Sequence, residues 1–267
     1  MVSVLIASYN RNVVNLINEL YLQLKKETIS FEIICLDDAS KSESNIENEK
    51  INLLPYCSFK SLKKNIGRSA IRNLLASKAT YNWLLFLDSD VLPTSSSFIS
   101  NYLKEIEKTN FSVFLGGIKY REYDNKNLLR WKFGKKNEEI LASIRNKNSE
   151  DYFFTANFLI EKTTFNSIKF NESIVDYGYE DLLFSKELIK NDIKINHIEN
   201  GVYHLGIDTN EVFISKTKKA VENLVFLEEK ELLRTDEIRL LKFVKQISFF
   251  KLDTIFISFL IATSSGA

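Results

Sequence analysis

Short, continuously apolar segments alternate with helical periodicity through the first ninety residues of the chain. The apolar segments are bounded by polar turns, while the intervening apolar residues, such as Leu16, Leu20 and Leu24, recur at the spacing of one helix face. Apolar strands separated by helices are typical of a parallel sheet covered on both faces. The pattern therefore predicts an α/β half with strands at residues 2–7, 31–36, 57–62 and 83–87 and helices at 13–28 and around 71–75.

The rest of the chain is less regular. Residues 121–150 are polar and are expected to form a loop, with Trp131 and Phe133 as isolated aromatic anchors. From about residue 210 the pattern is charged and long-helical, which predicts a helical tail. Between these parts we expect helices at 98–106 and 180–190 and strands at 111–120, 152–160, 193–198 and 202–205.

Composition excludes several classes of protein. Lys and Arg total 36 and Asp and Glu total 35, and this balance argues against a nucleic-acid-binding protein. The only cysteines, Cys35 and Cys57, lie in apolar segments, which excludes a disulfide scaffold, and two His with two Cys are too few for a structural zinc site. The opening lacks a basic leader, and the apolar run 254–263 is about half a membrane span, so a cytoplasmic protein is expected.

Three of the expected strands end in polar side chains, and parallel α/β sheets bind ligands at that edge. Strand one is followed by Ser8, Tyr9, Asn10 and Arg11, strand two by Asp37 and Asp38, and strand four by Asp88, Ser89 and Asp90. No GxGxxG follows strand one, and the chain contains no GxxxxGK[ST]. A dinucleotide fingerprint and a P-loop are therefore excluded.

Asp88 and Asp90 are two residues apart, so their side chains point to the same side of an extended backbone. Two such carboxylates suit Mn²⁺ or Mg²⁺, which share their oxygen ligands with substrate phosphates. A solvated turn after a strand is the alternative. His204, in the strand 202–205, is chemically suitable as an added ligand, although a lone strand His is more often structural.

The turn after strand two and the start of the next helix suggest donor contacts. A carboxylate at Asp37 or Asp38 can accept a hydrogen bond from a uracil imide or a ribose hydroxyl, or can simply cap the turn. Tyr9 can stack on a base. The helix that opens at Asn65, Gly67, Arg68 and Arg72 can present backbone N–H groups and guanidinium groups to phosphate oxygens, with a solvated helix face as the alternative.

A second acidic constellation, residues 176–181, precedes the helix 180–190. Glu180 and Asp181 suit the first turn of any helix because of its dipole. Gly178, however, is flanked by Tyr177 and Tyr179, which predicts an aromatic loop for an acceptor beside a carboxylate able to act as general base.

Taken together, these motifs resemble the family-2 glycosyltransferases with the GT-A fold. The residues that carry the resemblance are the opening segment 2–11, the turn 36–40, Asn65-x-Gly67-(x)4-Arg72-Asn73, Asp88-Ser89-Asp90 and Gly178-Tyr179-Glu180-Asp181. The last motif resembles the galactosyltransferase and chondroitin-polymerase branches, although Tyr179 stands where those often carry Trp and their second glycine is lost.

The resemblance implies a Rossmann-like, mostly parallel sheet with flanking helices: residues 1–91 bind a nucleotide-sugar, 92–206 bind the acceptor, and 207–267 form a helical extension. It also implies an inverting, metal-dependent transfer from a nucleotide-sugar, expected to be a UDP-sugar, to a saccharide or lipid-linked saccharide in cell-surface polysaccharide synthesis. Asp181 matches the general base and Glu180 an acceptor-orienting neighbour; Asp88, Asp90 and His204 match the metal site, with Mn²⁺ or Mg²⁺. Donor contacts are expected from Ser8, Tyr9, Arg11, Asp37, Asp38, Asn65, Arg68, Arg72, Asp88 and Ser89, and acceptor contacts from Tyr177, Gly178 and Tyr179.

Three alternatives remain open from the sequence. One is a sugar nucleotidyltransferase, which uses a comparable sheet. Such enzymes resemble one another in a glycine-rich loop after strand one, and residues 8–11 contain no glycine. A non-catalytic nucleotide- or carbohydrate-binding module would not need Asp90 or Asp181. In the tail, an apolar stripe with nearby lysines suits a helix docked on the domain or a peripheral contact with the inner face of the membrane; the stripe comprises Leu240, Phe243, Val244, Ile247 and Phe250.

Overall fold

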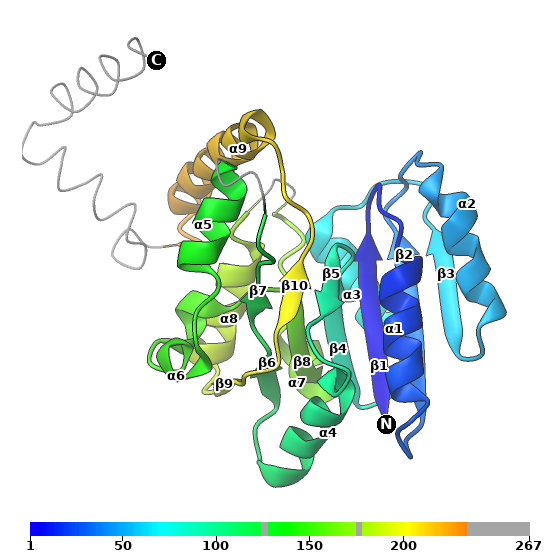
Figure 1. Cartoon of the computed structure of the whole chain (residues 1–267). Helices are drawn as coiled ribbons and strands as arrows, with labels where there is room; N and C mark the ends of the chain where they lie inside the picture. The colour runs from blue at the N-terminus through cyan, green and yellow to red at the C-terminus, as the bar shows by residue number, and fades with distance from the viewer. Residues whose placement is uncertain (124–127, 175–177, 234–267) are drawn as a thin grey trace, which may run out of the picture. The chain divides into compact units, whose positions relative to one another are not determined.

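The structure is a computed structural model that describes residues 1–123, 128–174 and 178–233. The chain divides into two compact units, residues 1–220 and 221–267. The first unit is built on a seven-stranded sheet with the order β3-β2-β1-β4-β8-β6-β9 (Figure 1). The described part of the second unit, residues 221–233, contains the end of helix α9 (Asn210–Glu229). Among the described helices, none is long and apolar enough to cross a membrane.

The parallel half of the sheet confirms the expectation for the first ninety residues. Its strands are β1 (Val2–Ser8), β2 (Phe31–Asp37), β3 (Cys57–Ser61) and β4 (Trp83–Asp88). The register pairs Ser8 with Asp37 and Ala7 with Asp88. Because these strands are parallel, the polar residues that follow them meet at one edge of the sheet.

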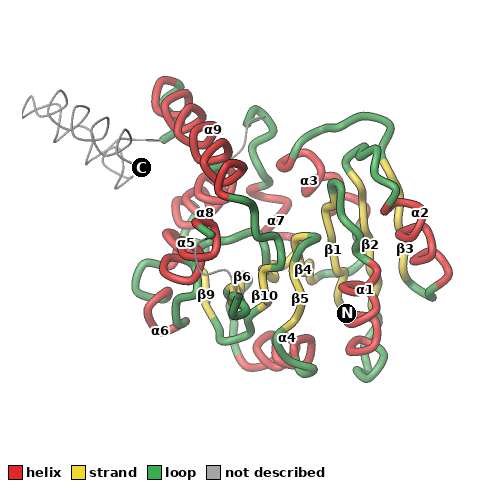
Figure 2. Tube along the Cα trace, turned by 45° about the horizontal axis from the view of Figure 1, so that its top comes forward, coloured by secondary structure: helices red, strands yellow, loops and turns green. Residues whose placement is uncertain are grey.

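Helices cover both faces of this sheet, as Figure 2 shows. Val4 and Ile6 of β1 pack into one cluster with α1 (Val14–Leu24) and α4 (Phe98–Lys108), whereas Leu5 packs on the opposite face against α3 (Arg68–Lys78). Successive strand residues point to opposite faces, so a continuously apolar strand serves both layers. On the edge side of β3 lie the short helix α2 (Ser44–Asn48) and the 3₁₀ helix η1 (Glu49–Leu53).

Beyond β4 the sheet is mixed. β8 (Asn157–Glu161) runs antiparallel to both β4 and β6 (Val113–Leu115), and β9 (Ile195–His197) is parallel to β6. A second sheet contains β5 (Val91–Pro93), β10 (Val202–His204) and β7 (Ile118–Lys119). The expected strand 111–120 is therefore two strands, separated at Gly116 and Gly117. The φ of Gly117 is +85°, a conformation that breaks an extended strand and that glycine adopts readily.

Two other expectations for the middle of the chain are wrong. Residues 121–150 contain helices α5 (Leu129–Asn137) and α6 (Ala142–Arg145), in which Trp131 is buried but Phe133 is 48% exposed. The expected strand 152–160 contains only β8, preceded by the 3₁₀ helix η2 (Ser149–Tyr152). α5 is rich in basic residues and places few apolar residues on its buried side, so its sequence carries no strong helical periodicity.

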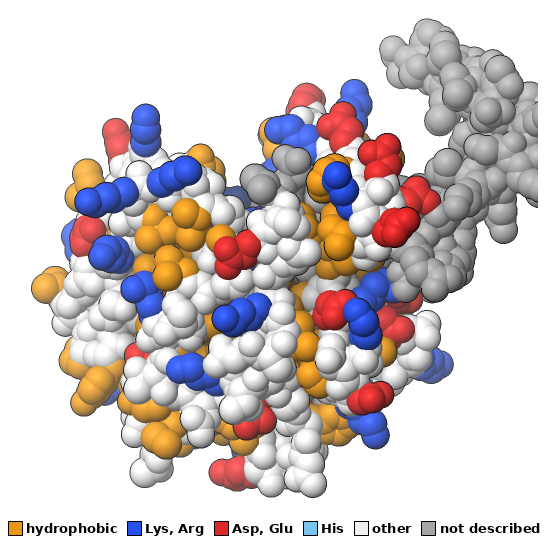
Figure 3. Space-filling model, turned by 180° about the vertical axis from the view of Figure 1, so that it is seen from behind, with side chains coloured by type: hydrophobic (Ala, Val, Ile, Leu, Met, Phe, Trp, Pro, Cys, Tyr) orange, Lys and Arg blue, Asp and Glu red, His pale blue; other side chains and the backbone are white. Residues whose placement is uncertain are grey.

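The remaining helices are α7 (Lys162–Ile168) and α8 (Glu180–Lys190), and α8 begins and ends where the sequence predicts. The face of the molecule drawn in Figure 3 carries interspersed basic and acidic side chains, in keeping with the balanced composition. The stripe from Leu240 to Phe250 lies outside the described residues, so the choice between docking and membrane contact stays a prediction.

Candidate active site

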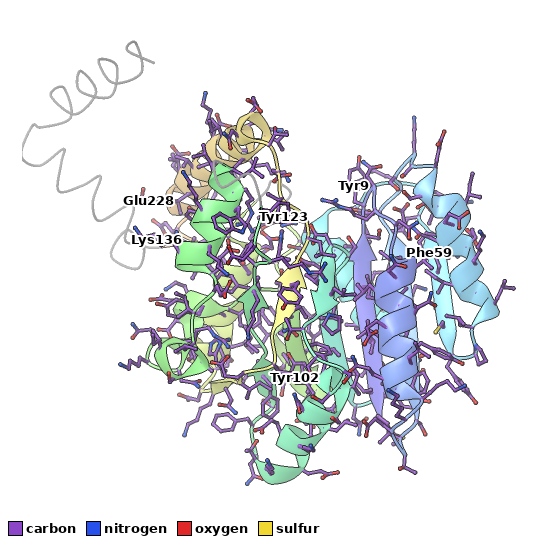
Figure 4. All side chains as sticks on the ribbon, viewed as in Figure 1. Tyr9, Phe59, Tyr102, Tyr123, Lys136 and Glu228 are labelled. Carbon is purple, nitrogen blue, oxygen red and sulfur yellow. The ribbon has the colours of Figure 1, made fainter. Side chains whose placement is uncertain are left out.

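A cavity of about 390 Å³ opens at the carboxyl edge of β1, β2 and β4, within the size range of small-ligand sites. Tyr9, which is 54% exposed, lies beyond the end of β1 (Figure 4). The side chains from the three strand ends and from the start of α3 therefore meet around one space. Of the residues expected at the donor or metal, those that line the cavity are Ser8, Tyr9, Arg11, Asp38, Asn65, Arg68, Arg72, Asp88, Ser89 and Asp90.

Asp37 does not line this cavity. Its side chain is fully buried and accepts hydrogen bonds from the N–H and hydroxyl of Ser40, the Ser61 hydroxyl (2.7 Å) and the Asn45 amide (3.1 Å). The oxygens that the sequence assigned to a nucleoside are thus occupied by the turn after β2, because a buried carboxylate needs such donors. The structure favours a supporting role for Asp37.

Asp38, the next residue, faces the cavity and holds the loop before α3. Its carboxylate accepts the backbone N–H groups of Ile66 (2.7 Å) and Gly67 (2.9 Å), and the Asn65 amide donates to its carbonyl (3.0 Å). Gly67 has a φ of +85°, which a side chain would strain. Asp38 therefore determines where the N-terminus of α3 lies.

Arg72 joins the two acidic stretches of the site. Its guanidinium donates to an Asp88 oxygen (2.9 Å) and to the Thr155 hydroxyl (2.9 Å), and it lies 3.6 Å from an oxygen of Glu180. Arg68 also contacts Glu180, at 3.1 Å. The Arg72 and Glu180 side chains are only 4% and 5% exposed, so this network is nearly dry. It brings the end of β4 and the start of α8, ninety residues apart in the chain, to one place.

The pKa values of Asp88 and Asp181 are shifted in opposite directions. Burial by itself raises the pKa of Asp88, but the charges of Arg72 and Arg68 outweigh it and lower that pKa. At Asp181, burial and the neighbouring Glu180 charge raise the pKa to about 7. One Asp181 oxygen accepts a hydrogen bond from the Leu182 N–H at 2.8 Å. In the part of the chain that the structure describes, the arginines form ion pairs with Glu180 and not with Asp181.

Asp90 lies beside His204 because β5 and β10 pair, with His204 opposite Val91. An Asp90 oxygen is 4.0 Å from His204 Nε2 and 3.5 Å from the Arg11 guanidinium. Gly206 makes room for this carboxylate, since a Cβ there would lie 2.0 Å from an Asp90 oxygen. His204 Nδ1 is buried without a hydrogen-bond partner among the described residues.

The expected metal set is only partly assembled. Asp90 and His204 present a carboxylate and an imidazole to each other, a donor pair that suits a divalent cation. Asp88 instead turns to Arg72. Within residues 1–123, 128–174 and 178–233, no group of three or more His, Cys, Asp or Glu side chains is placed to hold a metal. Asp90 and His204 therefore fit a divalent cation, whereas Asp88 is paired with Arg72 and its part in a metal site stays a prediction.

The segment before α8 is conformationally unusual. Gly178 and Tyr179 have φ values of +100° and +70°, and Tyr179 is the residue at the start of α8. A tyrosine in this left-handed region is strained, and such strain is concentrated at functional sites. Burial and the Asp181 charge raise the pKa of Tyr179, so its hydroxyl stays protonated beside that carboxylate. Tyr177 lies outside the described residues.

Two site residues have no motif in the sequence. Thr155 precedes β8, and its hydroxyl accepts a hydrogen bond from Arg72. Lys216 comes from α9 and lines the cavity. Neither a single threonine nor a lysine in a charged helix stands out in the sequence. Their places at the site follow only from the packing of elements that are far apart in the chain.

Comparison with known structures shows the fold. The S. aureus TarS 1–349 crystal structure is 22% identical to this chain, with a TM-score of 0.55 over 76% of this chain and 59% of that one. A structure of the same protein in complex with UDP-GlcNAc is 21% identical, with a TM-score of 0.53 over 76% of this chain and 57% of that one. The mannosyltransferase PcManGT from Pyrobaculum calidifontis, in complex with GDP-Man and Mn²⁺, is 14% identical, with a TM-score of 0.59 over 85% of this chain and 64% of that one.

The chain thus spans about three-fifths of these structures, and its likeness to them shows the GT-A fold. No curated protein matches the chain in sequence. The galactosyltransferase and chondroitin-polymerase branch is not confirmed by these similarities. A family model described as glycosyl transferase family 2 matches residues 3–171, which contain β1 to β8 and most of the cavity. The chain therefore belongs to glycosyl transferase family 2 and has the GT-A fold.

Proposed function

We propose that this glycosyltransferase transfers a sugar from a nucleoside-diphosphate sugar, with inversion at the anomeric carbon, to a hydroxyl of a saccharide or lipid-linked saccharide. Similar structures support the donor class, since TarS was solved in complex with UDP-GlcNAc and PcManGT in complex with GDP-Man and Mn²⁺. Among nucleotides, UDP is our first choice because two of these complexes, with UDP and with UDP-GlcNAc, carry it.

In the proposed arrangement, the base of the donor lies near the ends of β1 and β2 and its phosphates lie near the start of α3. Tyr9 offers an exposed ring for a base at the end of β1, beside Asp38 at the end of β2. Arg68, Arg72 and the N-terminus of α3 offer positive charge for the phosphates. Asp37 then acts as a positioning residue, because it holds the turn that carries Asp38.

Asp90 and His204 would hold the divalent cation, which when bound supplies positive charge to the diphosphate leaving group. Asp88, paired with Arg72, is left to orient that guanidinium and to face the donor. Replacing Asp90 with Ala is expected to weaken Mn²⁺-dependent donor binding. An unchanged dependence on Mn²⁺ would remove Asp90 from the metal site.

Asp181 is the proposed general base. It accepts the proton of the acceptor hydroxyl while that oxygen attacks the anomeric carbon, and the bond from this carbon to the diphosphate oxygen breaks with its electron pair leaving on the diphosphate. The observation that carries this assignment is the Arg72 network, which joins Glu180, the residue before the base, to the donor cavity. A base with a pKa near 7 is also well matched to neutral pH. Glu180 is buried against Arg68 and Arg72 and acts as a positioning residue.

The test is to incubate the full chain with UDP-, GDP- and dTDP-sugars, with and without Mn²⁺, and to measure nucleoside diphosphate release. We expect slow, metal-dependent release from one donor class even without acceptor. Pyrophosphate release would instead support a nucleotidyltransferase, and binding without turnover a non-catalytic module. Either result contradicts the proposal.

A further inference from the structure

One cationic side chain in the cavity comes from the C-terminal helix. Lys216 of α9 lines the same space as Arg72, Asp88 and Asp90. It lies outside residues 3–171, the part of the chain that the family model matches, so neither the motifs nor the family assigns it a role.

Contacts between the first turns of α9 and α5 hold the part of the helix that carries Lys216. The chain leads from β10 into α9 past the end of the sheet (Figure 1). Asn210 at the start of α9 accepts the Leu129 N–H of α5 (2.8 Å), and the Phe213 and Phe133 rings lie 5.8 Å apart. The first turns of α9 are therefore attached to α5.

Asp208 orients the lysine. Lys216 Nζ lies 3.0 and 2.8 Å from the two Asp208 oxygens, and the side chains are 42% and 18% exposed. The 42% exposure of the lysine side chain lets solvent screen the pair in part, so turning the ammonium from Asp208 toward another anion costs less than breaking a buried ion pair. The flexible stem of lysine allows such a movement.

The cationic side chains of the cavity differ in where their acidic partners lie. Arg72 and Arg11 contact Asp88 and Asp90, which themselves line the cavity. Arg68 contacts Glu180 and Lys216 contacts Asp208, and neither of these carboxylates is among the lining residues. Lys216 and Arg68 therefore add positive charge to the cavity from ion pairs whose carboxylates lie outside its lining.

Topology indicates which part of a donor Lys216 would meet. Asp38 follows β2, on one side of β1, whereas Asp88 and Asp90 follow β4 on the other side. Lys216 follows β10, which pairs with β5 directly after Asp90. Figure 1 shows α9 on the β4 side of β1, whereas Asp38, where the nucleoside is proposed to lie, follows β2 on the other side.

We propose that Lys216 binds the distal phosphate of the nucleoside diphosphate and stabilises the charge on this group as it leaves. The inference rests on the proposed donor class and adds a leaving-group contact from outside residues 3–171, the part of the chain that the family model matches. A preplaced cation acts where negative charge develops during transfer.

The test compares UDP with UMP, and GDP with GMP, by calorimetric titration of the full chain in the presence of Mn²⁺. For Lys216→Met we expect about tenfold weaker diphosphate binding, the usual scale for a charged hydrogen bond, with monophosphate binding unchanged. Lys219→Met, on the exposed surface of the same helix, is the matched control and should bind both like the wild type.

Undiminished diphosphate binding by Lys216→Met would overturn the inference and leave the proposed function intact. Equal losses for diphosphate and monophosphate would also overturn it, because they would indicate a general disturbance of the cavity. If the wild-type chain binds neither UDP nor GDP, the proposed function fails first, and the role of Lys216 fails with it.

Discussion

Asp88 lines the cavity and Asp181, the proposed base, lies at the start of α8, and their environments shift their pKa values in opposite directions. Both are desolvated, and burial alone would raise the pKa of each. Asp88 receives a direct hydrogen bond from Arg72, which lowers its pKa. Asp181 lies next to Glu180, and Arg68 and Arg72 form their ion pairs with Glu180. The pKa of Asp181 rises to about 7.

The difference shows how one buried arginine can create two chemical roles. Arg72 lowers the pKa of Asp88 at the cavity, while its contact with Glu180 leaves a carboxylate charge next to Asp181. Groups whose environments push their pKa values apart are typical of acid–base sites. The comparison predicts that the two aspartates respond differently to substitution and to pH.

The largest effect is expected from Asp181→Asn. Removing the general base should lower transfer by about 10²- to 10⁴-fold, with donor binding retained. Product formation and donor affinity are measured on the same protein. Asp192→Asn, the same change at an exposed turn residue just after α8, is the control and should keep full activity. A fully active Asp181→Asn variant would contradict the assignment.

Arg72→Gln should strongly destabilise the fold. Its loss leaves Asp88 and the buried Glu180 without their shared cation, and breaking a buried ion pair typically costs about 3–5 kcal/mol. Urea unfolding measures this free energy. Arg68→Gln is the comparison, because the Arg68 side chain is 51% exposed, and it should cost far less. Equal losses for the two variants would argue against Arg72 as the central contact.

The pH dependence of transfer should follow Asp181 and not Asp88. Because the base must be deprotonated and its pKa is raised to about 7, kcat/KM should fall about tenfold per unit as the pH drops below that value. The lowered pKa of Asp88 keeps this side chain ionised over the same range. A rate that is flat down to pH 5 would place the base elsewhere.

The smallest effect concerns stability. A carboxyl group with a raised pKa in the folded state disfavours folding as pH rises from about 4 to about 7, because only the unfolded chain ionises freely there. Asp181→Asn should thus match the wild type near pH 4 and be more stable at pH 8, by on the order of 1 kcal/mol. Thermal unfolding at both pH values measures it, and a less stable variant at pH 8 would contradict the raised pKa.

Local pattern was sufficient for much of the fold. The strands of the parallel half and the bounds of α8 follow from apolar runs and helical spacing, which are properties of neighbouring residues. The order of strands then brings Ser8, Asp38 and Asp88 to one edge of the sheet. Pattern-based prediction failed for the middle of the chain. α5 has few apolar residues on its buried side, and the turn at Gly116 and Gly117 interrupts an otherwise apolar run.

The sequence by itself determined the α/β architecture, the family and most of the side chains that gather at the cavity. Only the tertiary structure decided what each of them contacts: that Asp37 supports a turn while Asp38 faces the cavity, that Arg72 reaches both Asp88 and Glu180, and that Lys216 enters from α9. The reason is physical. Secondary structure depends on residues a few positions apart, whereas charge pairing and burial depend on distances in space between segments far apart in the chain.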